Sequence, residues 1–162
     1  MAVAHHVLFL CTDNSARSIL AEAILNSRGS GRFRAYSAGS HPTGTVNPYA
    51  LDTLARMGLE TDGLRSKSWA EFDGPTAPVF DCVITLCDAA AAEACPVWPG
   101  QQITTHWGLP DPAKVRGDAE SAQAFRDTYA ALGRRIDQLV TLPLDTLSPA
   151  ERQAQLLAVS QD

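Results

Sequence analysis

A chain of 162 residues, of which 45% are hydrophobic and 19% charged, has the size and composition of a single globular domain with a buried core. The formal net charge of −5 excludes a general affinity for nucleic acid or anionic membranes, so a bound anion must be held locally. The apolar stretch at residues 7–10 is too short for a signal peptide or a membrane span, and we expect a cytoplasmic protein.

Along the chain, short apolar or alternating stretches predict four strands of a parallel sheet, at residues 4–10, 33–38, 79–86 and 101–106. Helical periodicity and alanine content predict helices at residues 15–28, 48–57, 89–94, 119–139 and 148–157. The last of these begins at a capping box of Ser148 and Glu151. Strands that alternate with helices indicate a single-domain α/β fold. We assign residues 1–141 to this domain and residues 142–162 to a C-terminal extension, whose helix is expected to dock on the domain.

The stretch with the clearest chemistry is the C-x5-R-S pattern at residues 11–18, between the first strand and the first helix. A loop of this length can turn several backbone N–H groups inward as an anion nest, and the helix that follows adds the positive end of its dipole. Arg17 supplies a bidentate fork for a tetrahedral oxyanion. At this electropositive point the pKa of Cys11 is expected to be lowered, which makes the thiolate a nucleophile. The predicted oxyanion-binding loop consists of Thr12, Asp13, Asn14, Ser15, Ala16, Arg17 and Ser18.

The ends of the later predicted strands carry further cysteines. Cys87 closes the third strand, and if that strand lies beside the first, about 5 Å away, Cys87 comes within reach of Cys11. Cys95 lies eight residues further on, about 12 Å along an intact helix, so a disulfide between Cys87 and Cys95 requires residues 88–94 to unwind. That alanine-rich segment has almost nothing to bury and can melt at little cost. The alternative is that both cysteines only pack, as we expect of the mid-strand Cys82.

Asp111 is the remaining candidate for catalysis, because Pro110 and Pro112 fix the backbone on both sides of it. Held near a cysteine-bound oxyanion, its carboxyl could act as a general acid. The alternative is an ordinary turn aspartate. No metal site is expected, since the cysteines include no C-x2-C pair and the histidines are not spaced as their partners.

These motifs together resemble the low-molecular-weight tyrosine phosphatase superfamily, and the whole chain is more similar to its arsenate reductase branch. Besides the loop at 11–18, the resemblance rests on residues 37–42, 64–69, 85–88, 95–99 and 106–112. It implies a four-stranded parallel sheet in the order 2-1-3-4, flanked by helices.

The resemblance also implies a reaction. Cys11 would attack arsenate, the loop N–H groups and Arg17 would hold the adduct, and Asp111 would protonate the departing oxygen. Cys87 would then attack Cys11, expelling arsenite and leaving a disulfide. Cys95 would take over by attacking Cys87.

By the same resemblance, the protein needs no tightly bound cofactor but an external thiol reductant, either thioredoxin or glutathione with glutaredoxin. The reaction would serve arsenic detoxification, and phosphate or sulfate would compete with arsenate. Asn14 is expected to brace the loop, and Ser18 to hydrogen-bond the Cys11 thiolate. Asp13 stands where a glycine is common in the family, so its charge would oppose an anion unless the side chain faces outward.

Two alternatives to reduction use the same loop. A phosphatase of phosphotyrosine or small phosphoesters needs no redox step, but phosphatases of this family place aromatic residues after the Asp-Pro pair, where this chain has Ala113 and Lys114. A non-catalytic oxyanion sensor would need no poised nucleophile such as Cys11.

Overall fold

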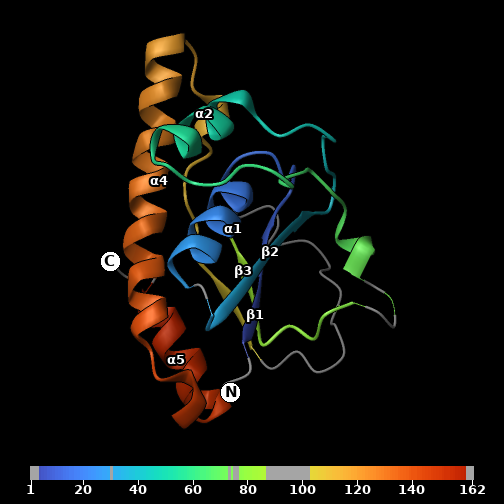
Figure 1. The fold of residues 1–162 in the computed structure, drawn as a ribbon, viewed down its shortest axis with the longest axis vertical. Helices are drawn as coiled ribbons and strands as arrows, with labels where there is room; N and C mark the ends of the chain where they lie inside the picture. The colour runs from blue at the N-terminus through green and yellow to red at the C-terminus, as the bar shows by residue number, and fades with distance from the viewer. Residues whose placement is uncertain (1–3, 30, 73, 75–76, 87–102, 160–162) are drawn as a thin grey trace.

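The computed structural model describes residues 4–29, 31–72, 74, 77–86 and 103–159. Four parallel strands form one sheet: β1 (His5–Cys11), β2 (Phe33–Gly39), β3 (Cys82–Thr85) and β4 (Ile103–His106). Their order is β2-β1-β3-β4 (Figure 1). Both the parallel sheet and its order therefore agree with the sequence-based prediction.

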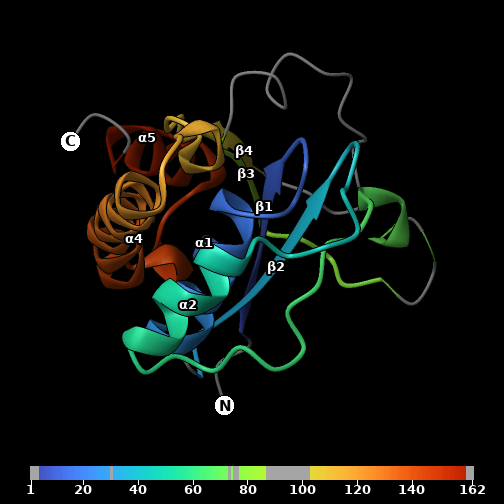
Figure 2. The same ribbon diagram turned by 90° about the horizontal axis from the view of Figure 1, so that it is seen from above.

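The described α-helices are α1 (Arg17–Arg28), α2 (Pro48–Arg56), α4 (Asp118–Thr141) and α5 (Pro149–Val159). Short 3-10 helices are η1 (Trp69–Phe72), η2 (Pro112–Lys114) and η3 (Leu144–Thr146). In Figure 2 the four labelled helices lie on one side of the sheet and η1 lies on the other. None of the helices in the described part of the chain has both the length and the apolarity to cross a membrane.

Alternating side chains of the strands divide the core between the two faces of the sheet. Phe9 and Trp107 are fully buried on the face that the helices cover, together with apolar residues of α1 and α4. Leu8 and Leu10 face the other way, into a smaller cluster that Phe72 of η1 helps to cover. Because both faces are covered, every residue of β1 except the half-buried His6 is buried, as the run of apolar residues in its sequence predicted.

The register brings the carboxyl ends of the strands to one edge of the sheet. Leu10 pairs with Thr85, and Thr85 pairs with His106. Cys11, the last residue of β1, pairs with Gly39, the last residue of β2. In open parallel sheets ligands bind outside this edge, so the segments that follow β1, β2 and β4 are placed to form a site.

Several element boundaries differ by one to three residues from the prediction, and two of these differences have a clear physical cause. The first helix begins at Arg17 rather than at residue 15, because the preceding residues stay in the loop and Asn14 has a left-handed φ of 48°. The third strand is shorter than predicted, since the Asp81 carboxylate accepts the N–H of His6 at 2.7 Å in place of a further backbone partner, and Val79 is exposed. The predicted helix at 89–94 lies outside the described residues.

The C-terminal helix α5 docks on the domain, against β4 and α4, as expected. Leu156 and Val159 are buried in the same cluster as the main core. The capping box forms at its start: the Glu151 N–H donates to Ser148 Oγ at 3.2 Å, and Glu151 Oε1 accepts the Ser148 N–H at 3.0 Å. Hydrogen bonds from the Ser148 backbone N–H and from its side chain lower the pKa of the Glu151 carboxyl, because they favour its charged form.

Candidate active site

The loop after β1 is held from outside by its backbone carbonyls. Three of these carbonyls accept N–H groups from the segment between β2 and α2: Thr12 from His41 at 2.9 Å, Asp13 from Thr43 at 3.1 Å and Ser15 from Asn47 at 2.9 Å. In a trans peptide the C=O and the following N–H point in opposite directions, and none of the described peptide bonds is cis. The N–H groups that follow these carbonyls therefore point to the inner side of the loop. Inward N–H groups are the arrangement that an anion nest requires, and the binding of an oxyanion there stays a prediction.

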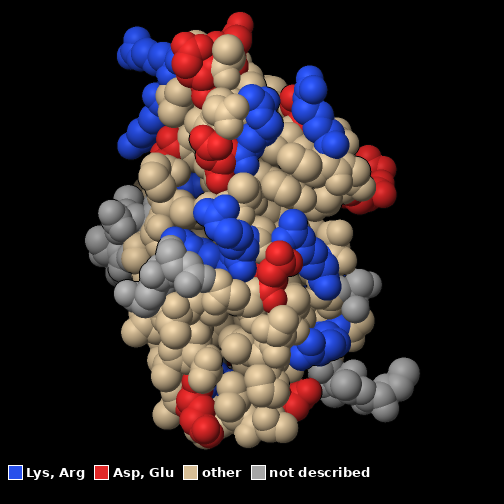
Figure 3. Space-filling view, turned by 90° about the vertical axis from the view of Figure 1, so that its left-hand side faces the viewer, with Lys and Arg blue, Asp and Glu red and all other residues tan. Residues whose placement is uncertain are grey.

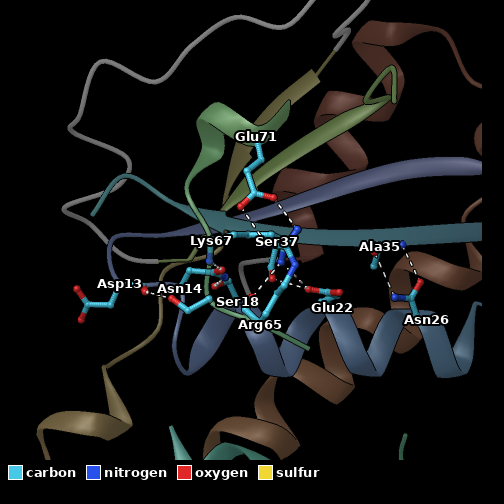
Figure 4. A network of polar contacts seen from close by, with 11 residues as sticks. Asp13, Asn14, Ser18, Glu22, Asn26, Ala35, Ser37, Arg65, Lys67 and Glu71 are labelled. Atoms are coloured by element: carbon cyan, nitrogen blue, oxygen red, sulfur yellow. Dashed lines mark hydrogen bonds and ion pairs between the residues drawn. The ribbon is translucent and has the colours of Figure 1, made fainter. Parts of the chain in front are cut away.

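Asn14 is the internal brace of this loop. Its side-chain Nδ2 donates to Ser18 Oγ at 2.8 Å, and its Oδ1 accepts the backbone N–H of Lys67 at 2.8 Å (Figure 4). Asn14 and Ser18 are both fully buried. Asparagine tolerates the left-handed conformation better than most residues, which suits its φ of 48°. Because the Ser18 oxygen accepts from Asn14, the Ser18 hydroxyl keeps its own proton to donate.

Gly39 is a site residue that sequence reasoning missed. A Cβ atom built on Gly39 would lie 2.4 Å from the Thr12 carbonyl oxygen and 3.0 Å from that of Cys11. The backbone of β2 can approach the loop only because residue 39 has no side chain. The Gly39 N–H also donates to the Lys67 carbonyl at 2.9 Å. In the sequence, Gly39 showed only as the residue that closes a predicted strand, within the segment 37–42 that resembles the family.

Arg17 and Asp111 meet at the open side of the loop. Arg17 Nη1 donates to the Leu109 carbonyl at 2.8 Å, and its Nη2 lies 3.6 Å from Asp111 Oδ2. The side chains are 12% and 13% exposed, so solvent screens this charge pair only weakly. Arg17 Nε is buried and has no acceptor among the described residues. The guanidinium is thus oriented through one nitrogen, while its Nε edge is left to donate to an oxyanion.

The Asp111 carboxylate is oriented by its own turn. Its Oδ1 accepts the N–H of Ala113 at 2.9 Å, which caps η2. Pro112 occupies the first position of that short helix and fixes its backbone. One carboxylate oxygen is therefore held by the backbone, and the other faces Arg17.

The remaining predicted site residues divide into those that are placed and those that are not. Cys11 is buried at the end of β1, at the mouth of the loop. Asp13 is exposed, and Figure 4 shows its carboxylate pointing away from Asn14 and the residues around it. Cys87 and Cys95 lie outside the described residues. Cys82 is buried in the core, where burial raises the pKa of its thiol.

The end of β3 lies beside β1, as the predicted contact between Cys11 and Cys87 requires. Strand β3 pairs with β1, and the Leu86 N–H donates to the Leu10 carbonyl at 2.9 Å. Residue 86 is thus hydrogen-bonded to the strand that carries Cys11. The first and third strands are neighbours, which was the condition on which contact between Cys11 and Cys87 depended.

A pair of poorly solvated charges lies beneath the loop. Lys67 Nζ is 3.8 Å from Glu22 Oε1, and the two side chains are 9% and 15% exposed. Burial raises the pKa of Glu22, while Lys67 and a hydrogen bond from the Ser37 hydroxyl oppose that rise. Burial also lowers the pKa of Lys67, with Glu22 as the main opposing charge. In both residues desolvation outweighs attraction, so each charged form depends on its partner.

The Glu22–Lys67 pair was also missed from the sequence, although the spacing of polar residues in α1 gave a signal for Glu22. Ser18, Glu22 and Asn26 follow one another at intervals of four in a helix that is otherwise apolar on its buried side. Residues spaced by four share one face of a helix. In the structure this polar stripe faces the loop and β2: Asn26 donates to the Ala35 carbonyl at 3.2 Å and accepts the Ala35 N–H at 2.8 Å (Figure 4).

On the face that α4 presents, charged side chains of the two signs are not sorted into separate patches. Figure 3 shows Lys and Arg side chains mixed with Asp and Glu over that face. Among the described residues, no group of three or more His, Cys, Asp or Glu side chains is arranged to hold a metal ion. The chemistry within the described chain therefore centres on the loop, Arg17 and Asp111.

The comparison with known proteins agrees with this geometry. The model of the family described as "Low molecular weight phosphotyrosine protein phosphatase" matches residues 6–152. The chain belongs to this phosphatase family. The match extends over the sheet, the loop at 11–18 and the Asp111 segment.

Several relatives within the phosphatase family are named for arsenate reduction. An arsenate reductase of Halalkalibacterium halodurans is 36% identical over 131 residues, which cover 80% of this chain and 91% of that protein. A glutaredoxin arsenate reductase of Synechocystis sp. is 30% identical over 134 residues, covering 83% of this chain and 95% of that protein. A solved arsenate reductase in the phosphate-binding state matches with a TM-score of 0.70 and 28% identity, over 85% of this chain and 97% of the other.

Replacing Gly39 by alanine tests the close approach of β2 to the loop. The new Cβ cannot be accommodated 2.4 Å from the Thr12 carbonyl, so the loop must shift. We expect phosphate, used as a tetrahedral oxyanion, to bind about tenfold or more weakly when measured by calorimetry, because binding needs the N–H groups in place. The control is Gly74→Ala, whose Cβ would meet no described atom within 4 Å. Equal phosphate affinity in Gly39→Ala and the wild type would contradict the expectation.

Replacing Lys67 by methionine tests the buried ion pair between Lys67 and Glu22. Without the ammonium, the pKa of Glu22 rises further above its ordinary value of 4.5. An acid whose pKa is raised by folding loses stability as the pH rises through that folded pKa. The loss in free energy of unfolding should therefore be small at pH 5 and grow to about 2 kcal/mol by pH 8, as measured by urea denaturation.

The matched control for Lys67→Met is Arg56→Met, which removes an exposed pair with Asp52 on α2. That change should cost less than about 1 kcal/mol at either pH. A loss for Lys67→Met that is equal at pH 5 and pH 8, or larger at pH 5, would show that Glu22 is not charged against Lys67.

Proposed function

We propose that the protein reduces arsenate to arsenite in a thiol-dependent reaction that serves arsenic detoxification. The observation that carries most weight is the pairing of Arg17, whose buried Nε has no acceptor in the described chain, with Asp111 at 3.6 Å beside the loop of Cys11. Relatives with this family's fold that match most of the chain are named arsenate reductases, which supports arsenate as the oxyanion.

The first step is attack by Cys11. Its thiolate forms a bond to arsenic while an arsenic–oxygen bond breaks. The inward N–H groups of the loop and the Arg17 guanidinium stabilise the negative charge on the remaining oxygens. Asp111 gives its proton to the departing oxygen, which leaves as water. Two observations support this separation of roles: the Arg17 Nε has no acceptor in the described chain, and the Asp111 carboxyl is held by its own turn beside Arg17.

The second step is the reduction itself. Cys87 attacks Cys11 Sγ, so that a disulfide forms and the sulfur–arsenic bond breaks. The electron pair of that bond stays on arsenic, which leaves as arsenite with the two electrons that the two thiols have lost. Cys95 then attacks Cys87 and releases Cys11 as a thiolate. Cys87 and Cys95 lie outside the described residues, so this relay is supported by their positions in the sequence and by the pairing of β3 with β1.

An external thiol system completes the cycle by reducing the disulfide between Cys87 and Cys95. Thioredoxin, or glutathione with glutaredoxin, has the required chemistry. One matched relative is named a glutaredoxin arsenate reductase, which supports the second of these. The reaction needs no metal and no tightly bound cofactor, and it suits the reducing cytoplasm.

The alternative function is hydrolysis of phosphotyrosine or small phosphoesters by the same loop. In the described structure the residues after Asp111 and Pro112 are Ala113 and Lys114 of η2, and neither can form an aromatic wall beside a phenyl ring. We therefore place phosphate, like sulfate, among the competing oxyanions, with phosphoester hydrolysis as a side activity.

Cysteine variants test the relay. Wild-type protein given arsenate and excess reductant should release arsenite. Cys87→Ser should release almost none, because no second thiol can attack the adduct. Cys95→Ser should stop after one turnover with a disulfide between Cys11 and Cys87, which mass spectrometry detects as the loss of two hydrogens and as a linked peptide.

The matched control for the relay is Cys82→Ala, which removes a buried cysteine that has no part in the reaction. It should keep the wild-type kcat wherever it is folded. Arsenite release by Cys87→Ser at the wild-type rate would rule out the relay. Efficient hydrolysis of an aryl phosphate by wild-type protein that reduces no arsenate would favour the phosphatase.

Asp111→Asn tests the general acid. The amide keeps the shape of the side chain but cannot give a proton to the departing oxygen, so kcat should fall by about 100-fold. Inhibition by phosphate should persist or become tighter, because a negative charge beside Arg17 is lost. Asp52→Asn, on the exposed side of α2, should behave as the wild type. A loss of phosphate affinity that matches the loss of kcat would instead indicate a binding role for Asp111.

A further inference from the structure

The segment that carries Asp111 has little regular structure of its own. We call residues 107–111 the acid loop; it runs from the end of β4 to η2. Its backbone N–H groups reach the third strand and its extension, from Trp107 to the Thr85 carbonyl at 2.8 Å and from Leu109 to the Leu86 carbonyl at 3.0 Å. Between them lies Gly108, which is exposed and has no side chain to fix its backbone.

Two arginines hold the carbonyls of this loop. Arg135, from the middle of α4, donates through Nη1 to the Trp107 carbonyl at 3.0 Å and approaches the Gly108 carbonyl at 3.5 Å. Arg17 donates to the next carbonyl, that of Leu109, at 2.8 Å. Three consecutive carbonyls thus face cations from two different helices, and the second cation is the one that faces the oxyanion site.

The start of the acid loop is anchored independently. Trp107 is fully buried, and its indole N–H donates to the Leu156 carbonyl of α5 at 2.9 Å. The side chain of Trp107 is therefore fixed, while the carbonyls of Trp107 and Gly108 are held by Arg135. A rotation of the peptide between residues 107 and 109 would carry the Leu109 carbonyl away from Arg17, and Asp111 with it.

We propose that Arg135 is a positioning residue for the acid loop: by holding the carbonyls of Trp107 and Gly108, it keeps Asp111 beside Arg17. This inference rests on the proposed function in that Asp111 is the general acid. In the described part of the chain Arg135 donates to carbonyls of the acid loop, so its role in this inference is the placement of the loop. Hydrogen bonds from charged donors are worth more than neutral ones, so one guanidinium can fix two peptide groups.

Amide hydrogen exchange of the whole protein tests the placement directly. The Ala113 N–H reports the Asp111 carboxylate, to which it is bonded at 2.9 Å, and the Leu109 N–H reports the loop backbone. In Arg135→Met both should exchange about tenfold faster, because the loop opens more often. The internal control is the Tyr49 N–H, which donates to the Asn47 side chain at 2.9 Å in the same kind of cap on α2 and should not change.

The matched control variant is Arg134→Met. Arg134 is the neighbour of Arg135 on α4, is exposed and has no hydrogen bond in the described part of the chain. It should leave the exchange of all three amides and the kcat as in the wild type. Arg135→Lys keeps the charge but presents it at the end of a more flexible side chain, and it should restore part of what Arg135→Met loses.

A double-mutant cycle separates positioning from loss of stability. Arg135→Met alone should lower kcat for arsenate about tenfold while changing KM less than about threefold, because the acid is displaced while the N–H groups of the loop at 11–18 stay in place. In an Asp111→Asn background, Arg135→Met should lower kcat no further. The same cycle with an aryl phosphate as substrate measures the contribution of the general acid Asp111 to kcat in a reaction without any redox step.

These measurements distinguish the failure of the inference from that of the function. A wild type that hydrolyses an aryl phosphate but reduces no arsenate would overturn the proposed reductase, and the cycle on the aryl phosphate would still decide on Arg135. Unchanged exchange at Leu109 and Ala113, or an equal effect of Arg135→Met with and without Asp111, would overturn the positioning role. A wild type that turns over neither substrate would overturn both.

Discussion

The site depends on the direction of three peptide groups. Thr12, Asp13 and Ser15 each direct a carbonyl outward to an N–H group of the segment at 41–47, and planar trans peptides then direct the following N–H groups inward. That segment lies beside the loop because β2 pairs with β1 in register up to Cys11 and Gly39. The sheet order therefore determines the shape of the loop at 11–18. No side chain at residue 39 can intervene, since a Cβ there would overlap the Thr12 carbonyl oxygen.

The charged pair beneath the loop shows how stability and placement differ. Burial raises the pKa of Glu22 and lowers that of Lys67. The cost of desolvating the two charges therefore offsets much of their attraction, and the intact pair contributes little to the free energy of folding. Its effect is local instead. Lys67 must be in place for its backbone N–H to meet Asn14 Oδ1, and Asn14 in turn reaches Ser18 at the start of α1. A buried ion pair thus gives the segment after residue 64 one favoured position against the loop.

Much of the architecture could be predicted from local patterns. The apolar run of β1, the periodicity of α4 and the capping box of α5 each follow from a few neighbouring residues, and the sheet order followed from the family resemblance. The C-x5-R-S spacing was enough to predict the loop, because its chemistry lies within eight residues. The division of the chain at residue 141 stays a prediction.

What could not be predicted depends on backbone contacts between distant segments. Gly39 matters through the approach of its backbone to Thr12, and a glycine in a sequence does not say what approaches it. Lys67 acts through its N–H, a group that every residue but proline has. Arg135 meets the acid loop 27 and 28 residues away, from one of several arginines on α4. By contrast, the polar stripe of Ser18, Glu22 and Asn26 was readable as an interruption of an apolar helix face.

The measurement that tests the account most directly is a titration of the reduced protein with phosphate, followed by proton–nitrogen NMR. Phosphate serves as an unreactive oxyanion, and the Arg17 Nε–H, buried without an acceptor in the described chain, is the reporter. We expect saturable downfield shifts of the Arg17 Nε–H and of the amides that follow the outward carbonyls, those of Asp13, Asn14 and Ala16, because all of them gain a charged acceptor. Saturation with these four signals unmoved, or with the largest shifts elsewhere in the chain, would contradict it.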